Sequence, residues 1–183
     1  MTDAITTAAD VVAFWREAGP AKWFARDDDF DARCRGLLGL HLAAATRLLD
    51  DWRTDPTGAL ALVLLLDQIP RNAFRGNAHA WATDPLAKSI ATEAVDAGLD
   101  LLTDEPLRIF FYLPFEHSEA LEDQQRSLAL HRERLHAPDA DRWAKLHLDI
   151  IARFGRFPHR NAALGRTTTE AEWDFLDEGG FAG

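Results

Sequence analysis

The stretch Asp149–Arg166 reads D-I-I-A-R-F-G-R-F-P-H-R-N-A-A-L-G-R and shows how this chain builds its elements. Its apolar residues Ile150, Phe154 and Phe157 recur at helical spacing, which predicts a helix with one buried face. Pro158 lacks an N–H and restricts the residue before it, so we expect the helix to end there. The polar residues that follow are then displayed in a turn.

The same stretch is basic in an otherwise acidic protein. No acidic residue occurs between Asp149 and Glu170, although the 183-residue sequence has a formal net charge of −10. A guanidinium group binds carboxylate or phosphate through paired hydrogen bonds. A turn rich in such donors and anchored by aromatic residues is predicted to bind an anion. The arginines concerned are Arg153, Arg156, Arg160 and Arg166.

Length and composition are typical of one globular domain. With 183 residues, of which 47% are hydrophobic and 27% charged, the chain is long enough for a core of its own. We therefore expect residues 1–183 to form a single domain. The acidic balance argues against nucleic acid and against anionic membranes as partners.

The sequence favours a cytoplasmic location. The lone Cys34 can form no internal disulfide, which suits a reducing compartment. Residues Met1–Asp10 have neither the basic nor the apolar part of a secretory signal. The longest uncharged apolar run, Ala59–Leu66, has eight residues, whereas a membrane span needs roughly 20.

Helical periodicity without period-two alternation predicts an all-α fold of about eight helices. Ala59–Leu66 is apolar on every side and is expected to be the central helix, ending at Pro70. Asp10 and Asp84 are expected to be N-caps, and Thr169 with Glu172 forms a capping-box pattern. The expected helices span approximately residues 10–19, 28–50, 59–66, 84–98, 105–112, 116–135, 141–157 and 169–176.

One short motif occurs twice in the chain, which suggests stacked helical hairpins of the solenoid kind. Ile69-Pro70-Arg71-Asn72 and Phe157-Pro158-His159-Arg160-Asn161 both follow an apolar helix. The two Arg-Asn pairs are predicted to point into one cleft and bind an anion there. Alternatively, they cap the carbonyls of helix C-termini, where cations are favoured.

Polar residues alternate with leucines on one face of the predicted helix 116–135. Isolated polar groups in a protein interior are costly unless they are hydrogen-bonded, so this face needs partners. It belongs either to an internal network among helices or to a polar pocket that His117 and Gln124 line. The residues of the face are His117, Leu121, Gln124, Leu128, His131 and Leu135.

Three residues are candidates for acid–base chemistry. His117 can transfer protons because an unperturbed imidazole titrates near neutral pH, with Glu116 or Asp67 to orient it. Asp67 lies at the end of a buried helix and needs a cation, so a structural pair with Arg71 or Arg160 is an equal alternative. Ser118 is an N-cap rather than a nucleophile, since the chain has no Gly-x-Ser-x-Gly elbow.

No metal ion and no cofactor is predicted. The spacing of the seven histidines matches no metal-binding motif, and neither a P-loop nor a dinucleotide fingerprint occurs. His147 shares a stripe with Trp143, Ile150 and Phe154, so we assign it to core packing.

Several longer motifs carry a family resemblance. They are Leu64–Asn72, Thr83–Ala87, Phe111–Glu119, Arg153–Asn161, Leu164–Arg166 and Gly180-Phe181. Through them the chain, from about Asp10 to Phe181, resembles the bacterial domain-of-unknown-function family 924. Ile69 and Phe115 stand where other hydrophobic residues are usual in that family. The resemblance implies an all-helical, tetratricopeptide-like fold and brings no activity with it.

These observations lead to one leading hypothesis for function. The protein is expected to bind a small anionic molecule, a carboxylate or phosphate, in a polar interhelical cleft and to hydrolyse it. The predicted catalytic residues are His117, Glu116 and Asp67. The predicted ligand-binding residues are Arg71, Asn72, Gln124, Arg156, His159, Arg160 and Asn161.

The alternative is a helical scaffold that binds a peptide or protein partner in a concave groove, with the polar residues structural. The six tryptophans support it, although most of them sit at spacings compatible with a core; these are Trp15, Trp52, Trp81, Trp143 and Trp173. The sequence is also compatible with a homo-oligomer.

Overall fold

A helix that is apolar on every side forms the core of the first part of the chain, as predicted. α5, Pro56–Val63, continues into a π-helical turn over Leu64–Gln68, and all residues from Gly58 to Gln68 are buried. A helix with no polar face has to be surrounded, since any exposed face would leave apolar surface in water. Helices α1 (Ala8–Ala18) and α7 (Asp84–Asp96) pack against α5.

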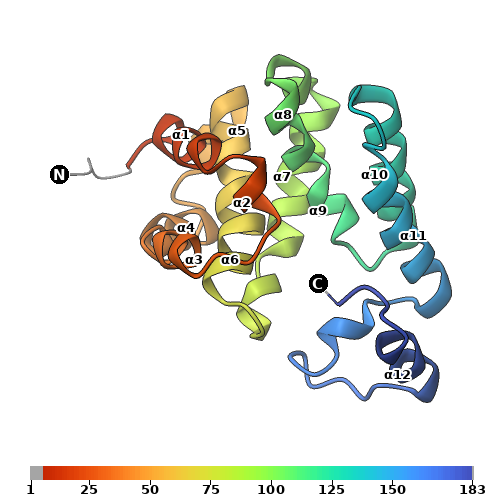
Figure 1. Cartoon of the computed structure of the whole chain (residues 1–183). Coiled ribbons are helices and arrows are strands. Elements are labelled where there is room, and N and C mark those ends of the chain that lie inside the picture. The colour runs from red at the N-terminus through yellow and green to blue at the C-terminus, as the bar shows by residue number, and fades with distance from the viewer. Residues whose placement is uncertain (1–5, 183) are drawn as a thin grey trace. The chain divides into compact units, whose positions relative to one another are not determined.

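Two compact units make up the chain. The computed structural model describes residues 6–182, so part of the predicted signal-free segment Met1–Asp10 lies outside the described residues. Residues 6–75 and 79–114 form unit 1, and residues 76–78 and 115–182 form unit 2. No strand occurs in residues 6–182, which confirms the predicted all-α class (Figure 1). A single domain over 1–183 and a tetratricopeptide-like stacking stay predictions.

Unit 1 has more helices than predicted, because several expected helices are divided. Its remaining helices are α2 (Pro20–Trp23), α3 (Asp28–Arg35), α4 (Leu38–Ala45), α6 (Ile69–Ala73) and α8 (Glu105–Arg108). Short 3-10 turns join them at Asp50–Thr54, Leu99–Leu102 and Ile109–Phe111. The predicted helix 28–50 is the clearest correction. It breaks at Gly36, whose N–H donates to the Arg33 carbonyl, and Leu42 and Leu48 beyond the break are exposed.

The starts of two helices differ from the prediction by one turn or less. Thr7, not Asp10, is the N-cap of α1, and Asp10 completes a capping box as its third residue. Thr83, not Asp84, precedes α7, with Asp84 and Pro85 as the first helical residues. The capping box is present at α1, whereas Thr83 makes no side-chain hydrogen bond to cap α7.

Gly58→Ala is expected to lower the free energy of unfolding by about 1–3 kcal/mol, because overpacking a close contact costs this much. A Cβ at Gly58 would collide with the backbone carbonyl of Trp52, and backbone cannot move aside as a side chain does. Gly39→Ala is the matched control: it is exposed in α4, its Cβ would meet nothing within 4 Å, and alanine should add roughly 0.5–1 kcal/mol. Urea unfolding of both variants checks the opposite signs; equal shifts in one direction would contradict the contact.

Unit 2 is built around a helical hairpin. α10 (Leu121–Arg134) and α11 (Arg142–Phe154) pack side by side, and α12 (Glu170–Asp177) follows a 3-10 turn at Pro158–Arg160 (Figure 1). α9 (Leu113–Glu116) leads into the unit. α11 ends three residues before Phe157, because Gly155 adopts the left-handed conformation and caps it.

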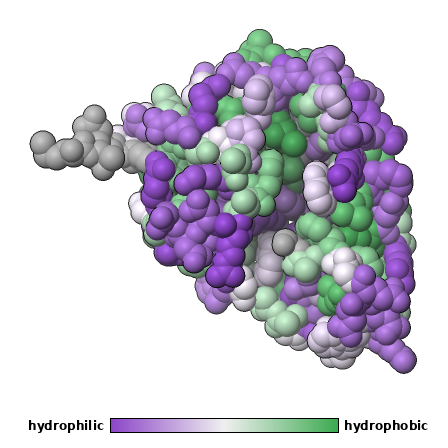
Figure 2. All heavy atoms as spheres, in the orientation of Figure 1, coloured by the Kyte–Doolittle hydropathy of each residue, from purple (hydrophilic) through white to green (hydrophobic). Residues whose placement is uncertain are grey.

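The core of unit 2 is small and largely aromatic. Phe157 and two isoleucines of α11 form it, and the partly buried Phe154, Phe175 and Phe181 pack against it. Trp143 and Trp173, whose spacing is compatible with a core, are instead 52% and 55% exposed. Figure 2 shows a mostly hydrophilic face with smaller hydrophobic patches between the polar side chains.

Candidate functional site

The predicted site residues Asp67, Arg71 and Asn72 belong to unit 1 and lie in or after the π-helical turn. Pro70 does not end the helix as predicted, because the chain runs on as α6. The N–H of Ile69 donates to the Leu64 carbonyl, five residues back, and Pro70 has no N–H to donate. Pro70 therefore cannot donate to the Leu65 or the Leu66 carbonyl.

Four side chains cap the four carbonyls from Leu65 to Gln68. His41 Nδ1 lies 2.8 Å from the first, and the Thr83 hydroxyl donates to the second over 2.5 Å. Arg71 donates to the third over 2.6 Å, and the Asn72 amide donates to the fourth over 3.0 Å. Arg71 and Asn72 thus make the contacts expected from the capping alternative.

The carboxylate of Asp67 is fully buried beside Arg71. Its oxygens lie 2.6 Å from the Gln68 amide nitrogen and 3.1 Å from Arg71 Nη1. Arg71 also binds both carboxylate oxygens of Asp84 at 2.9 Å. Burial lowers the pKa of Arg71, but the charges of Asp67 and Asp84 outweigh it and raise that pKa above its ordinary value. Arg71 thus holds two carboxylates of unit 1 in one ion-pair network, and a role of these residues in ligand binding stays a prediction.

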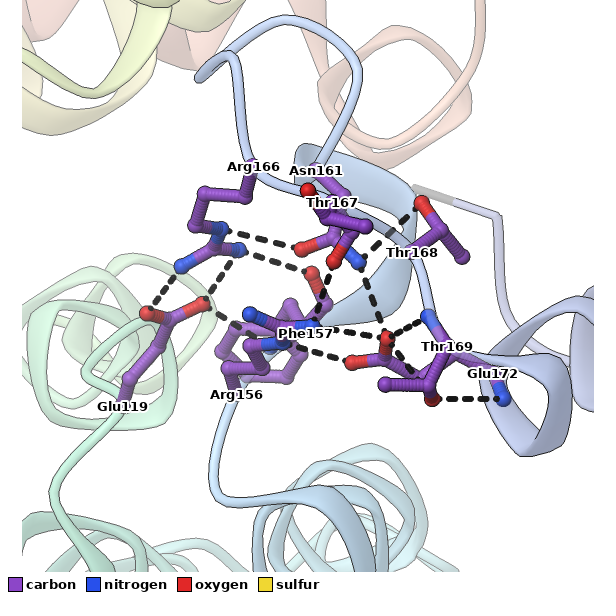
Figure 3. Close-up of polar contacts among 9 residues, drawn as sticks. All are labelled: Glu119, Arg156, Phe157, Asn161, Arg166, Thr167, Thr168, Thr169 and Glu172. Atoms are coloured by element: carbon purple, nitrogen blue, oxygen red, sulfur yellow. Dashed lines mark hydrogen bonds and ion pairs between the residues drawn. The ribbon is translucent and has the colours of Figure 1, made fainter.

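In unit 2, Arg156 and Asn161 converge on Glu172 (Figure 3). Arg156 donates to both carboxylate oxygens, over 2.6 Å and 2.8 Å, and the Asn161 amide donates over 3.3 Å. The Thr169 N–H donates over 2.7 Å and completes the predicted capping box of α12. The hydrogen bonds of Arg156, opposed in part by burial, lower the pKa of Glu172 to about 2.

Arg166 and Glu119 continue this network on the other side of Asn161. Arg166 binds both oxygens of Glu119 at 2.7 Å and 3.0 Å and donates to the side-chain oxygen of Asn161 over 2.9 Å. Glu119 also accepts the Phe157 N–H over 2.8 Å. Burial raises the pKa of Glu119, but the Arg166 and Phe157 hydrogen bonds lower it further, so it lies below its usual range. The acid-free basic stretch therefore supplies cations to acids that lie elsewhere in the sequence.

A buried carboxylate faces two imidazoles in the interior of unit 2. Glu116, at the end of α9, is only 3% exposed. Its Oε1 lies 3.1 Å from His147 Nδ1, on α11, and its Oε2 lies 3.6 Å from His131 Nε2, on α10. Three helices thus bring an acid and two bases to one point.

Backbone carbonyls fix the tautomers of both histidines. His131 Nδ1 lies 2.9 Å from the Ser127 carbonyl, and His147 Nδ1 lies 2.8 Å from the Trp143 carbonyl. A carbonyl only accepts, so each Nδ1 carries the hydrogen and Nε2 holds the lone pair of the neutral ring. The Nδ1–H of His147 is shared with Glu116 Oε1. In neutral His131 the lone pair of Nε2 faces Glu116 Oε2, and two lone pairs repel each other. A proton shared between these two atoms would turn this repulsion into a hydrogen bond.

Electrostatics favour the ionised form of Glu116. Burial raises its pKa, but the hydrogen bond from His147 and the charges of His147, His131 and His117 lower it further, to below its ordinary value. No hydrogen-bond donor in residues 6–182 reaches Glu116 Oε2, although a buried oxygen normally has one. Such an arrangement of acid and bases can hold or transfer a proton.

Gln124 binds the backbone on either side of His117, next to Glu116. Its amide nitrogen donates to the carbonyls of Glu116 and Ser118, over 2.5 Å and 2.6 Å. These bonds cap the C-terminal end of α9, where helical carbonyls lack partners. The amide oxygen of Gln124 is buried and receives no hydrogen bond from the described part of the chain.

His117 and Ser118 do not lie on a helix, in contrast to the prediction. α10 begins only at Leu121, which is exposed, so its buried face carries Gln124, Ser127, Leu130 and His131. The Ser118 hydroxyl donates to Asp123 over 2.6 Å and accepts the Ala120 N–H, as a turn residue does. Of the predicted face, Gln124 and His131 are buried, Leu121 is exposed, and His117, Leu128 and Leu135 are partly exposed.

His159 and Arg160 flank the aromatic core of unit 2. The Arg160 guanidinium stacks over the Phe157 ring at 4.5 Å, and the partly exposed His159 lies 5.6 Å from the same ring. The His147 ring lies 5.3 Å from Phe157 on another side. Phe157 therefore links the predicted anion-binding residues to the acid–base cluster.

The structure brings together some of the predicted residues and adds two that were missed. Within unit 2, Glu116 and Gln124 are in contact, and His159 and Arg160 share Phe157. Asp67, Arg71 and Asn72 belong to unit 1, so a common cleft with Arg160 stays a prediction. His147 was assigned to core packing, and His131 to a polar face that is either an internal network or the lining of a pocket. No pattern in the sequence shows that they meet Glu116, because the contact depends on the packing of three helices.

The described residues contain neither a metal-binding cluster nor a helix that could span a membrane. No group of three or more His, Cys, Asp or Glu side chains in residues 6–182 is arranged to hold a metal ion. None of the helices in this range is both long and apolar enough to span a bilayer.

Comparison with known proteins places the chain in a family. The model of the family "Bacterial protein of unknown function (DUF924)" matches residues 11–180. A solved structure, that of the protein of unknown function ATU0120 from Agrobacterium tumefaciens, is 50% identical with a TM-score of 0.90. The match covers 94% of this chain and 97% of that chain. No curated protein matches the chain significantly. The chain thus belongs to the DUF924 family of bacterial proteins of unknown function.

Proposed function

We propose that unit 2 contains a small hydrolytic site. In it Glu116 and His147 act as a general acid–base pair, here named the Glu116–His147 dyad. The supporting observation is the buried 3.1 Å contact between Glu116 Oε1 and His147 Nδ1. In such a pair the carboxylate fixes the tautomer and stabilises the imidazolium, and Nε2 transfers the proton. Glu116 keeps the orienting role predicted from the sequence, and His147 replaces His117.

The proposed reaction is hydrolysis of a small anionic ester. His147 Nε2 removes a proton from water while the water oxygen bonds to the acyl carbon or phosphorus of the substrate. The bond to the leaving oxygen then breaks, and the imidazolium returns the proton to that oxygen. No further group is consumed, so the imidazole is regenerated in each cycle.

Arg160 and His159 are the proposed anion-binding residues. Both lie against Phe157, which also contacts the His147 ring. The charge of Arg160 contributes to the lowered pKa of Glu119, so its field acts on an anion nearby. Arg156 and Asn161 are assigned a supporting role instead, because Glu172 accepts their hydrogen bonds.

His147→Gln is expected to lower kcat for 4-nitrophenyl phosphate or 4-nitrophenyl hydrogen succinate by about 10²–10⁴-fold, the usual contribution of general acid–base catalysis. Arg160→Ala should raise KM with a smaller effect on kcat. His136→Gln, an exposed histidine beyond α10, is the matched control and should leave both constants unchanged. Hydrolysis that survives His147→Gln in a folded protein would exclude the dyad.

A helical scaffold for a peptide partner remains the second candidate. The observation in its favour is the exposure of Trp143 and Trp173 on two helices of unit 2, since aromatic residues are enriched where proteins bind one another. The scaffold requires no turnover. If the wild-type protein hydrolyses neither nitrophenyl ester above the background rate, this candidate is favoured over the dyad.

A further inference from the structure

The C-terminal Phe181 lies against the imidazole of the proposed dyad. Its ring centroid is 4.6 Å from that of His147 and 5.2 Å from that of His159, edge to face in both cases. Trp143 lies 6.3 Å away, and the core cluster of Ile150, Ile151 and Phe157 packs against Phe181. A ring from outside the hairpin therefore fills an aromatic-walled space beside His147.

Phe181 belongs to no helix and is reached through two glycines. α12 ends at Asp177, and Gly179 then takes a positive φ of 84° that reverses the chain. At Gly180 the chain passes so close to Phe175 that a Cβ would collide with the carbonyl oxygen and lie 2.6 Å from the ring. Only glycine allows this approach. The turn is thus built to return residue 181 to the α11 surface.

Side-chain packing alone holds Phe181 in place. The last backbone hydrogen bond of the tail runs from the Gly180 N–H to the Phe175 carbonyl over 2.9 Å, and none follows in the described residues. Burying a phenylalanine side chain in part favours the closed arrangement about tenfold. A ligand whose own ring makes the same contacts can therefore replace it.

We propose that Phe181 is a displaceable plug: its ring occupies the space in which an aromatic group of a ligand binds next to His147. The ligand class is a small anion that carries an aromatic ring, with its charge on Arg160 and His159. That Phe181 covers His147 is inferred from the ring contacts, whereas a role of the plug in regulating hydrolysis rests on the proposed function.

The plug is tested by the reactivity of His147, which needs no turnover. Diethyl pyrocarbonate transfers an ethoxycarbonyl group to a neutral imidazole nitrogen, releasing ethanol and carbon dioxide, and peptide mass spectrometry assigns the rate to each histidine. Phe181→Ala is expected to increase the rate at His147 about tenfold. Gly180→Ala keeps the ring but displaces the turn, and should give a similar increase. Trp173→Ala, which removes an exposed ring from α12, is the matched control and should change nothing.

The ligand class is tested in the Phe181→Ala variant with two probes. Benzoate, which has a ring and a carboxylate, should slow the modification of His147 towards the wild-type rate. Acetate, which has only the carboxylate, should not. Unchanged reactivity in both Phe181→Ala and Gly180→Ala would exclude the plug, and equal protection by both anions would exclude the aromatic class. A reactive His147 in Phe181→Ala, combined with undiminished hydrolysis in His147→Gln, would exclude the dyad and leave the plug standing.

Discussion

Glu172→Ala is expected to lower the free energy of unfolding of the protein by about 2–4 kcal/mol, because the buried carboxylate accepts the charged hydrogen bonds of the partly exposed Arg156 and also caps α12. Arg156 would keep its charge without the carboxylate that binds it at 2.6 Å and 2.8 Å. α12 would also lose its capping box, because the Thr169 N–H donates to the same carboxylate. Urea unfolding, followed by the fluorescence of the tryptophans, measures the change.

Glu170→Ala is the matched control for this prediction. Glu170 is an exposed acid in the same first turn of α12, and its removal should change stability by no more than about 0.5 kcal/mol. Similar losses in the two variants would mean that the charge of the helix end, rather than the Arg156 pair, is what matters.

The pH dependence of stability gives a second measure of Glu172. Its folded-state pKa of about 2 lies below the ordinary value of 4.5, so the ionised form stabilises the fold above pH 4.5. As the pH falls from 4.5 towards 2 this contribution disappears, and it amounts to about 3 kcal/mol. Glu172→Gln should therefore flatten the acid side of the stability curve. A curve as steep as that of the wild type would contradict the lowered pKa.

Arg71→Ala is expected to cost about 3–5 kcal/mol in unit 1 for a related reason. The fully buried Asp67 would lose its guanidinium, Asp84 would lose a two-pronged partner, and the Asp67 carbonyl would lose the side chain that caps it. Arg71→Lys should recover only part of the loss, because an ammonium group lacks the planar fork. Thermal unfolding by circular dichroism checks the order of the three proteins.

Arg16→Ala serves as its control. Arg16 pairs with Asp104, but both side chains are more than half exposed, so the pair should contribute at most about 1 kcal/mol. If Arg71→Ala were as mild as Arg16→Ala, the capping network of the π-helical turn would not be holding unit 1 together.

Local chemistry made much of the fold predictable. The apolar run that becomes α5 has no polar face, and Thr169 with Glu172 forms the expected capping box. Pro70 was misjudged, because a proline ends a helix only where its missing N–H is needed. At Pro70 the side chains of His41 and Thr83 replace it by binding the Leu65 and Leu66 carbonyls, and neither these contacts nor the π-helical turn leaves a pattern in the sequence. The break at Gly36 was equally hard to predict, because a glycine inside a helical pattern is usually tolerated.

The candidate site was harder to predict because it depends on contacts between distant residues. Glu116 and Gln124 could be chosen from their positions, but His131 and His147 meet Glu116 only when three helices pack. Likewise the arginines of the basic stretch are visible in the sequence, whereas Glu119 and Glu172 as their partners are not. Periodicity identifies a buried face and says nothing about which side chain lies opposite.

The π-helical turn at Leu64–Gln68 amounts to one surplus amino acid accommodated inside a helix. Deleting a single residue here would restore an ordinary α-helical path and rotate everything downstream by about 100°. Arg75, just after α6, would then be turned away from Asp31 of α3, with which it forms an ion pair. Relatives of this chain should therefore tolerate amino-acid replacements in this segment far better than a change in its length, and an alignment gap there should mark a rebuilt helix rather than a neutral loss.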